Sequence, residues 1–225
     1  PHKQYLEHHG FSNYGKGPRA LYDGEIAYTD HHIGRLLKAL AASPVRDRTA
    51  VVLTGDHGEA FGEHGVFFHG RDMWDEIMRV PLIFSVPGAP PRRIARRTSA
   101  VDIAPTIMDL AGLPEDAGAR GTSLIPELFG AEGAPRALLM DQPKNPYYPP
   151  KRAFIEGRYK LHHAIDSNTY RLFDLDKDPK ESNDLADSDQ DLLKKVRRSY
   201  ALFASEIVEI NPVHALDTGG PSESR

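Results

Sequence analysis

A short apolar run that ends in a cluster of polar residues constrains the fold of this chain more than any other feature. Residues 49–54 read Thr-Ala-Val-Val-Leu-Thr, which is typical of a strand buried on both faces of a parallel sheet. Gly55-Asp56-His57-Gly58 follows at the carboxyl end of this predicted strand. Ligands of open α/β sheets bind outside the carboxyl ends of the strands, so the turn lies where a functional site is expected.

Helix and strand patterns alternate through the rest of the first half. A second buried strand is predicted at 80–86, and helices are predicted at 21–42, around 73–78 and at 101–111. This alternation indicates an α/β fold, with a mostly parallel sheet flanked by helices. Residues 112–150 are rich in Gly, Pro and Ala and are predicted to be irregular.

The C-terminal part has a different pattern, and we expect two domains, residues 1–140 and 141–225. Two antiparallel strands are predicted at 152–161 and 169–175, followed by an amphipathic helix at 188–210 and a disordered tail. The second domain is therefore expected to be a small antiparallel-sheet subdomain with one helix packed on it.

Composition excludes several classes of function. The 225 residues are 40% hydrophobic, which is enough for a substantial core, and the formal net charge of −4 argues against nucleic acid as a partner. The absence of cysteine excludes disulfides, thiolate metal sites and a Cys nucleophile within this chain. No apolar run approaches the roughly 20 residues of a transmembrane helix. The chain opens on Pro1 rather than Met, so we expect an internal start, and an exported or periplasmic location of the full-length protein stays open.

Asp56 and His57 are the first candidates for chemistry. A carboxylate and an imidazole are good ligands for a divalent cation, and the flanking glycines permit the sharp bend that lets adjacent residues face one ion. In isolation, a polar turn with a capping Asp and a surface His explains the motif equally well. The loop that follows adds Glu63, His64 and His69 within a few positions, a density of titratable groups that is unusual for a plain loop.

Several blocks of sequence together resemble the sulfatase branch of the alkaline-phosphatase superfamily. The blocks occur in the order of the family and cover roughly residues 1–187. They are LYDGEIAYTDHHIGRLL, TGDHGEAFGEHG, FHGRDMWDEIMRVPLIFSVPG, SAVDIAPTIMDLAGLP, GTSLIPEL, FIEGRYKL and RLFDLDKDPKESNDLA. The resemblance implies an alkaline-phosphatase-like fold, with residues 1–140 as the C-terminal portion of the catalytic domain.

The resemblance also assigns roles to individual residues. The family's metal pair, an Asp followed by Asn or His, falls on Asp56 and His57, and the family's substrate-binding or catalytic His falls on His2. Many relatives carry a Lys at the position of His69, which is therefore expected to face the transferred group and the leaving oxygen. For Glu63 and His64 we expect loop-shaping hydrogen bonds, with support of the metal ligands through hydrogen bonds as the alternative. His8, His9, His31, His32, His162 and His163 are expected to face solvent without a role.

The family's nucleophile has no counterpart in this sequence. Sulfatases use a formylglycine made from Cys or Ser in a Cys/Ser-x-Pro/Ala-x-Arg motif near an Asp-Asp metal pair, and neither motif occurs here. We therefore expect the N-terminal half of the catalytic domain to lie outside this chain, and the isolated chain to be inactive toward p-nitrophenyl sulfate. The expected cofactor is one divalent ion, Ca, Mn, Mg or Zn.

Three functions remain open at this point. The first is hydrolysis of a small-molecule or glycan sulfate ester. The second is cleavage of a phosphate or phosphonate ester or phosphoethanolamine transfer, which His57 and His69 favour because both depart from the common sulfatase pattern. The third is an inactive fragment or degenerate, non-catalytic module, against which the joint retention of His2, Asp56, His57 and His69 argues.

Overall fold

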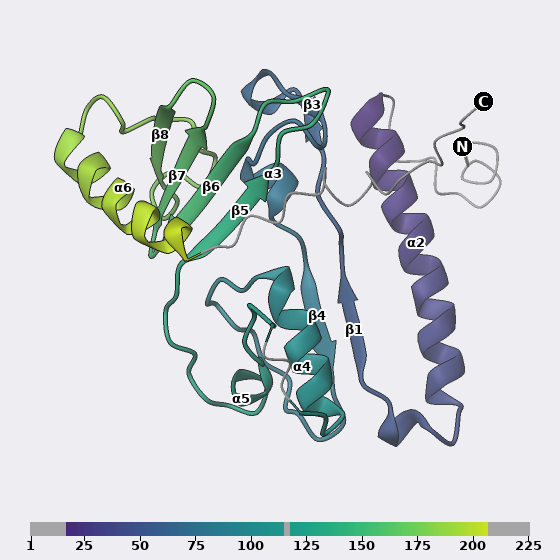
Figure 1. Ribbon diagram of the computed structural model, residues 1–225. Coiled ribbons are helices and arrows are strands. Elements are labelled where there is room, and N and C mark those ends of the chain that lie inside the picture. The colour runs from purple at the N-terminus through teal and green to yellow at the C-terminus, as the bar shows by residue number, and fades with distance from the viewer. Residues whose placement is uncertain (1–16, 115–117, 207–225) are drawn as a thin grey trace, which may run out of the picture. The chain divides into compact units, whose positions relative to one another are not determined.

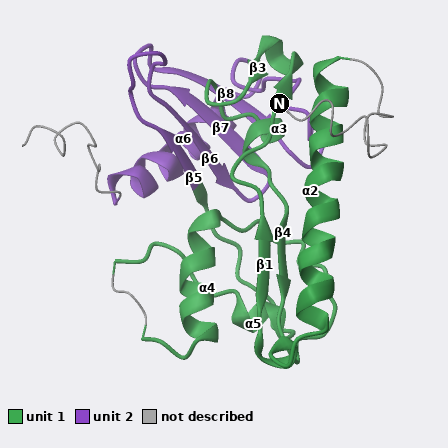
Figure 2. Cartoon of the chain, turned by 90° about the vertical axis from the view of Figure 1, so that its right-hand side faces the viewer, with its two compact units in different colours: residues 1–138 green, residues 139–225 purple. Residues whose placement is uncertain are grey.

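The computed structural model describes residues 17–114 and 118–206. The chain forms two compact units, residues 1–138 and 139–225, which are distinguished by colour in Figure 2 and described separately below. His2 and the predicted disordered tail lie outside the described residues, so His2 stays a prediction. The assignment of two domains divided near residue 140 also stays a prediction. Among the described helices, none has the length and apolar character that crossing a membrane requires.

The first unit combines helices with two small two-stranded sheets (Figure 1). Its elements, in chain order, are α2 (Pro18–Ala41), β1 (Val51–Thr54), β2 (Ala60–Phe61), β3 (Phe67–Phe68), α3 (Asp75–Met78), β4 (Leu82–Ser85), α4 (Ile103–Leu110) and α5 (Ile125–Leu128). Short 3-10 turns lie at Arg46–Arg48, Glu63–Gly65 and Ala100–Asp102. The predicted helices and strands of this region are present, and α5 interrupts the segment that was predicted to be irregular.

The pairing of β1 with β4 differs from the expectation. The two predicted strands are adjacent but antiparallel, with Val51 opposite Ser85 and Thr54 opposite Leu82. Neither strand is buried on both faces, since Thr54 and Ile83 are exposed. The prediction of a parallel, doubly buried pair was therefore wrong for these strands. The physical reason is that an apolar, β-branched run reports the tendency of a segment to be buried and carries no information on strand direction.

A buried carboxylate organises the end of the first unit. Asp102 is completely buried and accepts hydrogen bonds from the backbone N–H groups of Ser99 (2.9 Å) and Thr122 (3.0 Å) and from the guanidinium of Arg136. Burial alone raises the pKa of Asp102, but these hydrogen bonds outweigh it and lower the pKa below its ordinary value. A Cβ on Gly121 would lie 2.0 Å from the carbonyl oxygen of Val101, so only glycine fits beside this carboxylate.

The second unit is a four-stranded sheet with one helix. The strands lie in the order β5-β6-β7-β8, and both β6–β7 and β7–β8 are antiparallel. The elements are β5 (Leu138–Gln142), β6 (Lys151–Glu156), β7 (Tyr159–Ala164), β8 (Thr169–Asp174) and α6 (Gln190–Ser205). The sequence predicted one strand over 152–161 where the structure has a hairpin. Gly157, at φ 57°, makes the turn, since a left-handed conformation is cheapest for glycine.

Helix α6 packs on the sheet through an aromatic contact surface. Its N-terminus is capped by Asp189, whose side chain accepts the Leu192 N–H at 3.0 Å. Tyr200 and Phe203 lie against Phe154 of β6, with ring centroids 5.8 and 5.6 Å apart. The predicted amphipathic helix is thus present, and its buried face is the one that carries Tyr200 and Val196.

Two histidines of β7 were wrongly predicted to face solvent. His162 contacts the buried carboxylate of Glu181 at 2.7 Å, and His163 hydrogen-bonds the hydroxyl of Tyr200 at 2.9 Å. Burial lowers the pKa of His163, with a smaller opposing hydrogen bond from Asn168. Adjacent residues of a strand point to opposite faces, and here both faces have polar partners from other elements, which the local sequence does not reveal.

Candidate metal and substrate site

The turn after β1 is held against α3 by a close backbone approach at Gly58. The Gly58 N–H donates to the carbonyl oxygen of Ile77 at 2.7 Å. A Cβ at Gly58 would lie 2.1 Å from the carbonyl oxygen of Glu76, so no larger residue fits without displacing one of the two segments. The sequence Gly-Asp-His-Gly therefore fixes the position of Asp56 and His57 through its second glycine.

Asp56 and His57 place two potential ligand atoms close together on this turn. The Asp56 Oδ1 accepts the backbone N–H of His57 at 3.0 Å, and this bond is the main cause that lowers the pKa of Asp56. The His57 Nδ1 lies 2.9 Å from the Gly58 carbonyl oxygen. Because a carbonyl only accepts, Nδ1 carries the proton and Nε2 keeps its lone pair. This Nε2 lies 3.6 Å from the Asp56 Oδ2.

His69 lies directly against His57. The two imidazole rings stack, with centroids 3.9 Å apart and planes 28° from parallel. The His69 Nδ1 contacts both carboxylate oxygens of Glu59, at 3.3 and 3.2 Å. The structure therefore brings together Asp56, His57 and His69, and it adds Glu59, to which the sequence analysis gave no role.

The donor atoms at this corner fit a divalent cation. The His57 ring has its Nδ1–H fixed by a carbonyl, the usual arrangement for an imidazole that ligates through Nε2, and the nearby Asp56 Oδ2 is a hard anionic donor. Both side chains are accessible, with exposed fractions of 40% and 89%. Across residues 17–114 and 118–206, no group of three or more His, Asp or Glu side chains has the arrangement of a complete metal site. The described residues thus fit part of a coordination shell.

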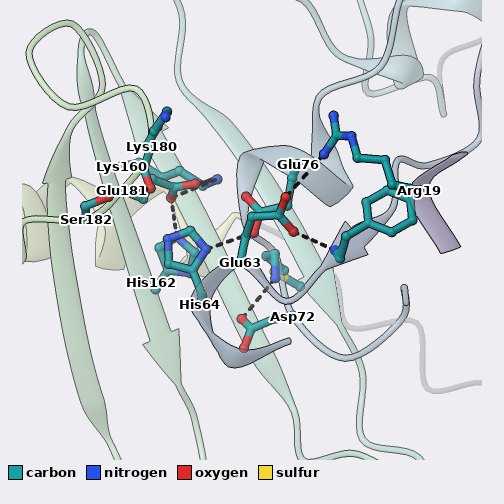
Figure 3. Close-up of polar contacts among 12 residues, drawn as sticks. Arg19, Glu63, His64, Asp72, Glu76, Lys160, His162, Lys180, Glu181 and Ser182 are labelled. Atoms are coloured by element: carbon teal, nitrogen blue, oxygen red, sulfur yellow. Dashed lines mark hydrogen bonds and ion pairs between the residues drawn. The ribbon is translucent and has the colours of Figure 1, made fainter. Parts of the chain in front are cut away.

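Glu63 and His64 have the loop-shaping role that the sequence predicted. Glu63 accepts the Phe61 N–H at 2.5 Å and pairs with Arg19 at 3.4 Å, while His64 contacts Glu76 at 2.8 Å (Figure 3). His64 also stacks flat on the indole ring of Trp74, with planes 9° apart. These contacts tie the loop that joins β2 and β3 to Arg19 of α2 and to Glu76 of α3.

Sequence reasoning missed Glu59 and the importance of Gly58. Both belong to the same Gly-Asp-His-Gly-Glu motif, so their proximity to the site was implied by position alone. Their partners were not, because His69 follows β3 and Glu76 lies in α3, both later in the chain than the motif. The sequence signal that could have identified Glu59 is the His at position 69, where the family has a Lys. An imidazole there can be held by a nearby carboxylate, and Glu59 is such a carboxylate.

Comparisons with known proteins identify the family of this chain. A family model described as Sulfatase matches residues 2–113, and one described as N-sulphoglucosamine sulphohydrolase, C-terminal, matches residues 62–201. The choline-sulfatase of Rhizobium meliloti (strain 1021) is 33% identical over 174 residues, covering 76% of this chain and 33% of its own length. The chain belongs to the sulfatase family of the alkaline-phosphatase superfamily.

Solved structures show the same fold. A 2-O GAG sulfatase superimposes with a TM-score of 0.70 at 28% identity, covering 86% of this chain and 45% of that one. A phosphonate monoester hydrolase from Silicibacter pomeroyi gives a TM-score of 0.72 at 25% identity, covering 83% and 40%. The predicted alkaline-phosphatase-like fold class is thereby confirmed. The chain spans 33% of the length of the choline-sulfatase, 45% of the 2-O GAG sulfatase and 40% of the phosphonate monoester hydrolase.

Proposed function

We propose that this chain supplies part of the metal and substrate site of a sulfuric ester hydrolase. The observation that carries the proposal is the meeting of Asp56, His57 and His69 at the carboxyl end of β1, where a sulfatase-family chain is expected to bind its ester. The substrate class is a small-molecule or glycan sulfate ester.

Asp56 and His57 would hold the cation through Oδ2 and Nε2. When bound, a divalent cation acts as a Lewis acid and template for the ester oxygens. The backbone N–H of His57 and the Gly58 carbonyl keep both side chains turned outward from the turn, so the donor atoms are oriented before any ligand arrives. Ca, Mn, Mg and Zn all remain candidates.

His69 would act at the leaving oxygen. Cleavage of a sulfate ester builds negative charge on this oxygen, which His69 in its imidazolium form would stabilise by donating its Nε2–H in the transition state. His69 is half-exposed, with 49% of its side chain accessible, and is oriented by His57 and Glu59. His2 would be a second substrate-binding group. The formylglycine nucleophile typical of the family, and the remaining metal ligands, are not assigned to any residue of this chain.

A phosphonate or phosphate ester is the second candidate substrate. The likeness to the phosphonate monoester hydrolase from Silicibacter pomeroyi supports it, as do the imidazoles at positions 57 and 69. Both candidates use the same residues, so only the transferred group differs.

The two candidates are separated by paired rate measurements on the full-length gene product that contains residues 1–225. We expect kcat/KM for p-nitrophenyl sulfate to exceed that for p-nitrophenyl phenylphosphonate by at least about tenfold, a difference of about 1.4 kcal/mol in transition-state binding. The reverse ratio would replace the proposed function by the second candidate. A protein that turns over neither ester contradicts both.

A further inference from the structure

The carboxylate of Glu59 contacts the imidazole of His69 and is much less exposed to solvent than that imidazole. We propose that Glu59 is a positioning residue, which keeps the Nδ1–H of His69 directed at its own carboxylate, so that Nε2 is presented to the ester and carries the proton that the imidazolium form donates to the leaving oxygen. The proposal deepens the proposed function and rests on it for the role of His69.

The hydrogen-bond geometry defines the tautomer. Both oxygens of Glu59 lie within 3.3 Å of the same ring nitrogen, Nδ1 of His69. A carboxylate accepts hydrogen bonds, so the Nδ1–H donates to it and Nε2 is left for the ester, with a lone pair in the neutral ring and a second N–H in the imidazolium. Only 14% of the Glu59 side chain is accessible, against 49% of His69, so the anchor is shielded while the ring it holds is open.

A second contact fixes the plane of the ring. His69 stacks on His57, whose own orientation is set by its hydrogen bond to the Gly58 carbonyl. Rotation of the His69 ring about its Cβ–Cγ bond would break the bond to Glu59, and displacement of the ring would break the stack. Three consecutive residues, His57, Gly58 and Glu59, therefore determine where the Nε2 of His69 points.

A second Glu–His pair, between His64 of the β2–β3 loop and Glu76 of α3, shows what a purely structural pair looks like. His64 contacts Glu76 at 2.8 Å and stacks flat on Trp74, and only 17% of its side chain is accessible. That ring is largely covered by the protein. His69 differs because one edge is anchored and the other is accessible, which is what a group that acts on a ligand requires.

The tautomer can be measured directly, without substrate. Imidazole ¹⁵N NMR of the full-length gene product at about pH 8, where an ordinary imidazole is neutral, should show His69 as the Nδ1–H form, assigned by loss of its signals in His69→Gln. Glu59→Ala should shift His69 toward the Nε2–H form that imidazoles prefer in water. Glu59→Gln keeps an acceptor oxygen and should keep the wild-type form.

The kinetic test uses the full-length gene product with the same variants. Glu59→Ala should lower kcat about 10- to 100-fold while KM changes less than about threefold, and Glu59→Gln should recover most of kcat. Glu76→Gln is the matched control, since it alters the structural Glu–His pair, and its kcat should stay within about twofold of wild type. Circular dichroism of each variant establishes that it is folded.

Two results would overturn the proposal. One is an unchanged His69 tautomer in Glu59→Ala, and the other is an equal loss of kcat in Glu59→Ala and Glu76→Gln. A wild-type protein that hydrolyses no ester contradicts the proposed function alone, because the NMR comparison still decides whether Glu59 sets the tautomer.

Discussion

The imidazole rings of His57 and His69 stack with their centroids 3.9 Å apart. His57 lies on the turn after β1, and His69 follows β3, so the β2–β3 hairpin folds back over the turn. This contact joins the residue proposed to bind the cation to the residue proposed to act on the ester. The predictions below test the elements that hold this contact in place and the buried polar groups elsewhere in the chain.

Gly58→Ala is expected to displace the turn that carries Asp56 and His57. The new Cβ would lie 2.1 Å from the Glu76 carbonyl oxygen, so the backbone must move, at a cost of about 1–3 kcal/mol in the free energy of unfolding. Urea unfolding measures this cost. Gly34→Ala, in α2 with no atom within 4 Å of the new Cβ, is the control and should be neutral or stabilising. Equal effects of the two substitutions would contradict the close approach at Gly58.

Phe68→Gly is expected to stabilise the hairpin. Phe68 has φ 68°, a left-handed conformation that costs a residue with a Cβ about 1–2 kcal/mol, and its side chain is 61% exposed, so little burial is lost. Phe67→Gly should have the opposite sign, because the Phe67 ring covers Gly62. Thermal melts of both variants give the comparison, and a destabilised Phe68→Gly protein would show that the aromatic ring contributes more than its exposure indicates.

Lys160→Met is expected to destabilise the second unit by about 3–5 kcal/mol. Lys160 is completely buried, and its ammonium lies 3.1 Å from the buried carboxylate of Glu181 (Figure 3), which the substitution leaves without this counter-charge. The double variant Lys160→Met with Glu181→Gln should recover at least about 1 kcal/mol of that loss. Lys194→Met, which breaks an exposed pair with Asp191, should change the free energy of unfolding by less than about 0.5 kcal/mol. A double variant no more stable than Lys160→Met would argue against a charge effect.

His163 is expected to make stability fall in mild acid. Burial lowers the pKa of His163 in the folded protein, and Arg152 and Arg197 act in the same direction, against an opposing bond from Asn168. The unfolded chain therefore binds the proton more readily, so the free energy of unfolding decreases as the pH falls below about 6.5, the ordinary value. His163→Gln should remove this part of the decrease. Urea unfolding at a series of pH values checks it, and an identical pH dependence in the variant would rule His163 out as its source.

Much of the fold and of the candidate site could be predicted because the signals are local. The apolar run before Gly55 marked a strand, and the amphipathic periodicity of residues 188–210 marked α6. The antiparallel direction of β4 could not be predicted, since composition reports burial and not direction. Residues 152–161 looked like one strand because the residues on both sides of Gly157 are typical of strands. The turn signal of Gly157 was outweighed by this pattern.

The contacts that complete the site are not local, which is why the sequence did not reveal them. Glu59 was visible in the motif, but its partner His69 reaches it only through the β2–β3 hairpin. The family's pattern, rather than any spacing rule, brought His69 into the prediction. For His162 and His163 the partners Glu181 and Tyr200 come from later segments, so their burial could not be read from β7 alone.

The metal content of the full-length gene product tests the central claim most directly. Elemental analysis of the purified wild-type protein should find about one equivalent of a divalent cation, as a site that uses Asp56 and His57 requires. Asp56→Ala and His57→Ala should each lose most of the cation and of the sulfate-ester turnover, while His64→Ala, outside the proposed ligand set, should keep its cation. Wild-type cation content in folded Asp56→Ala and His57→Ala proteins would contradict the assignment.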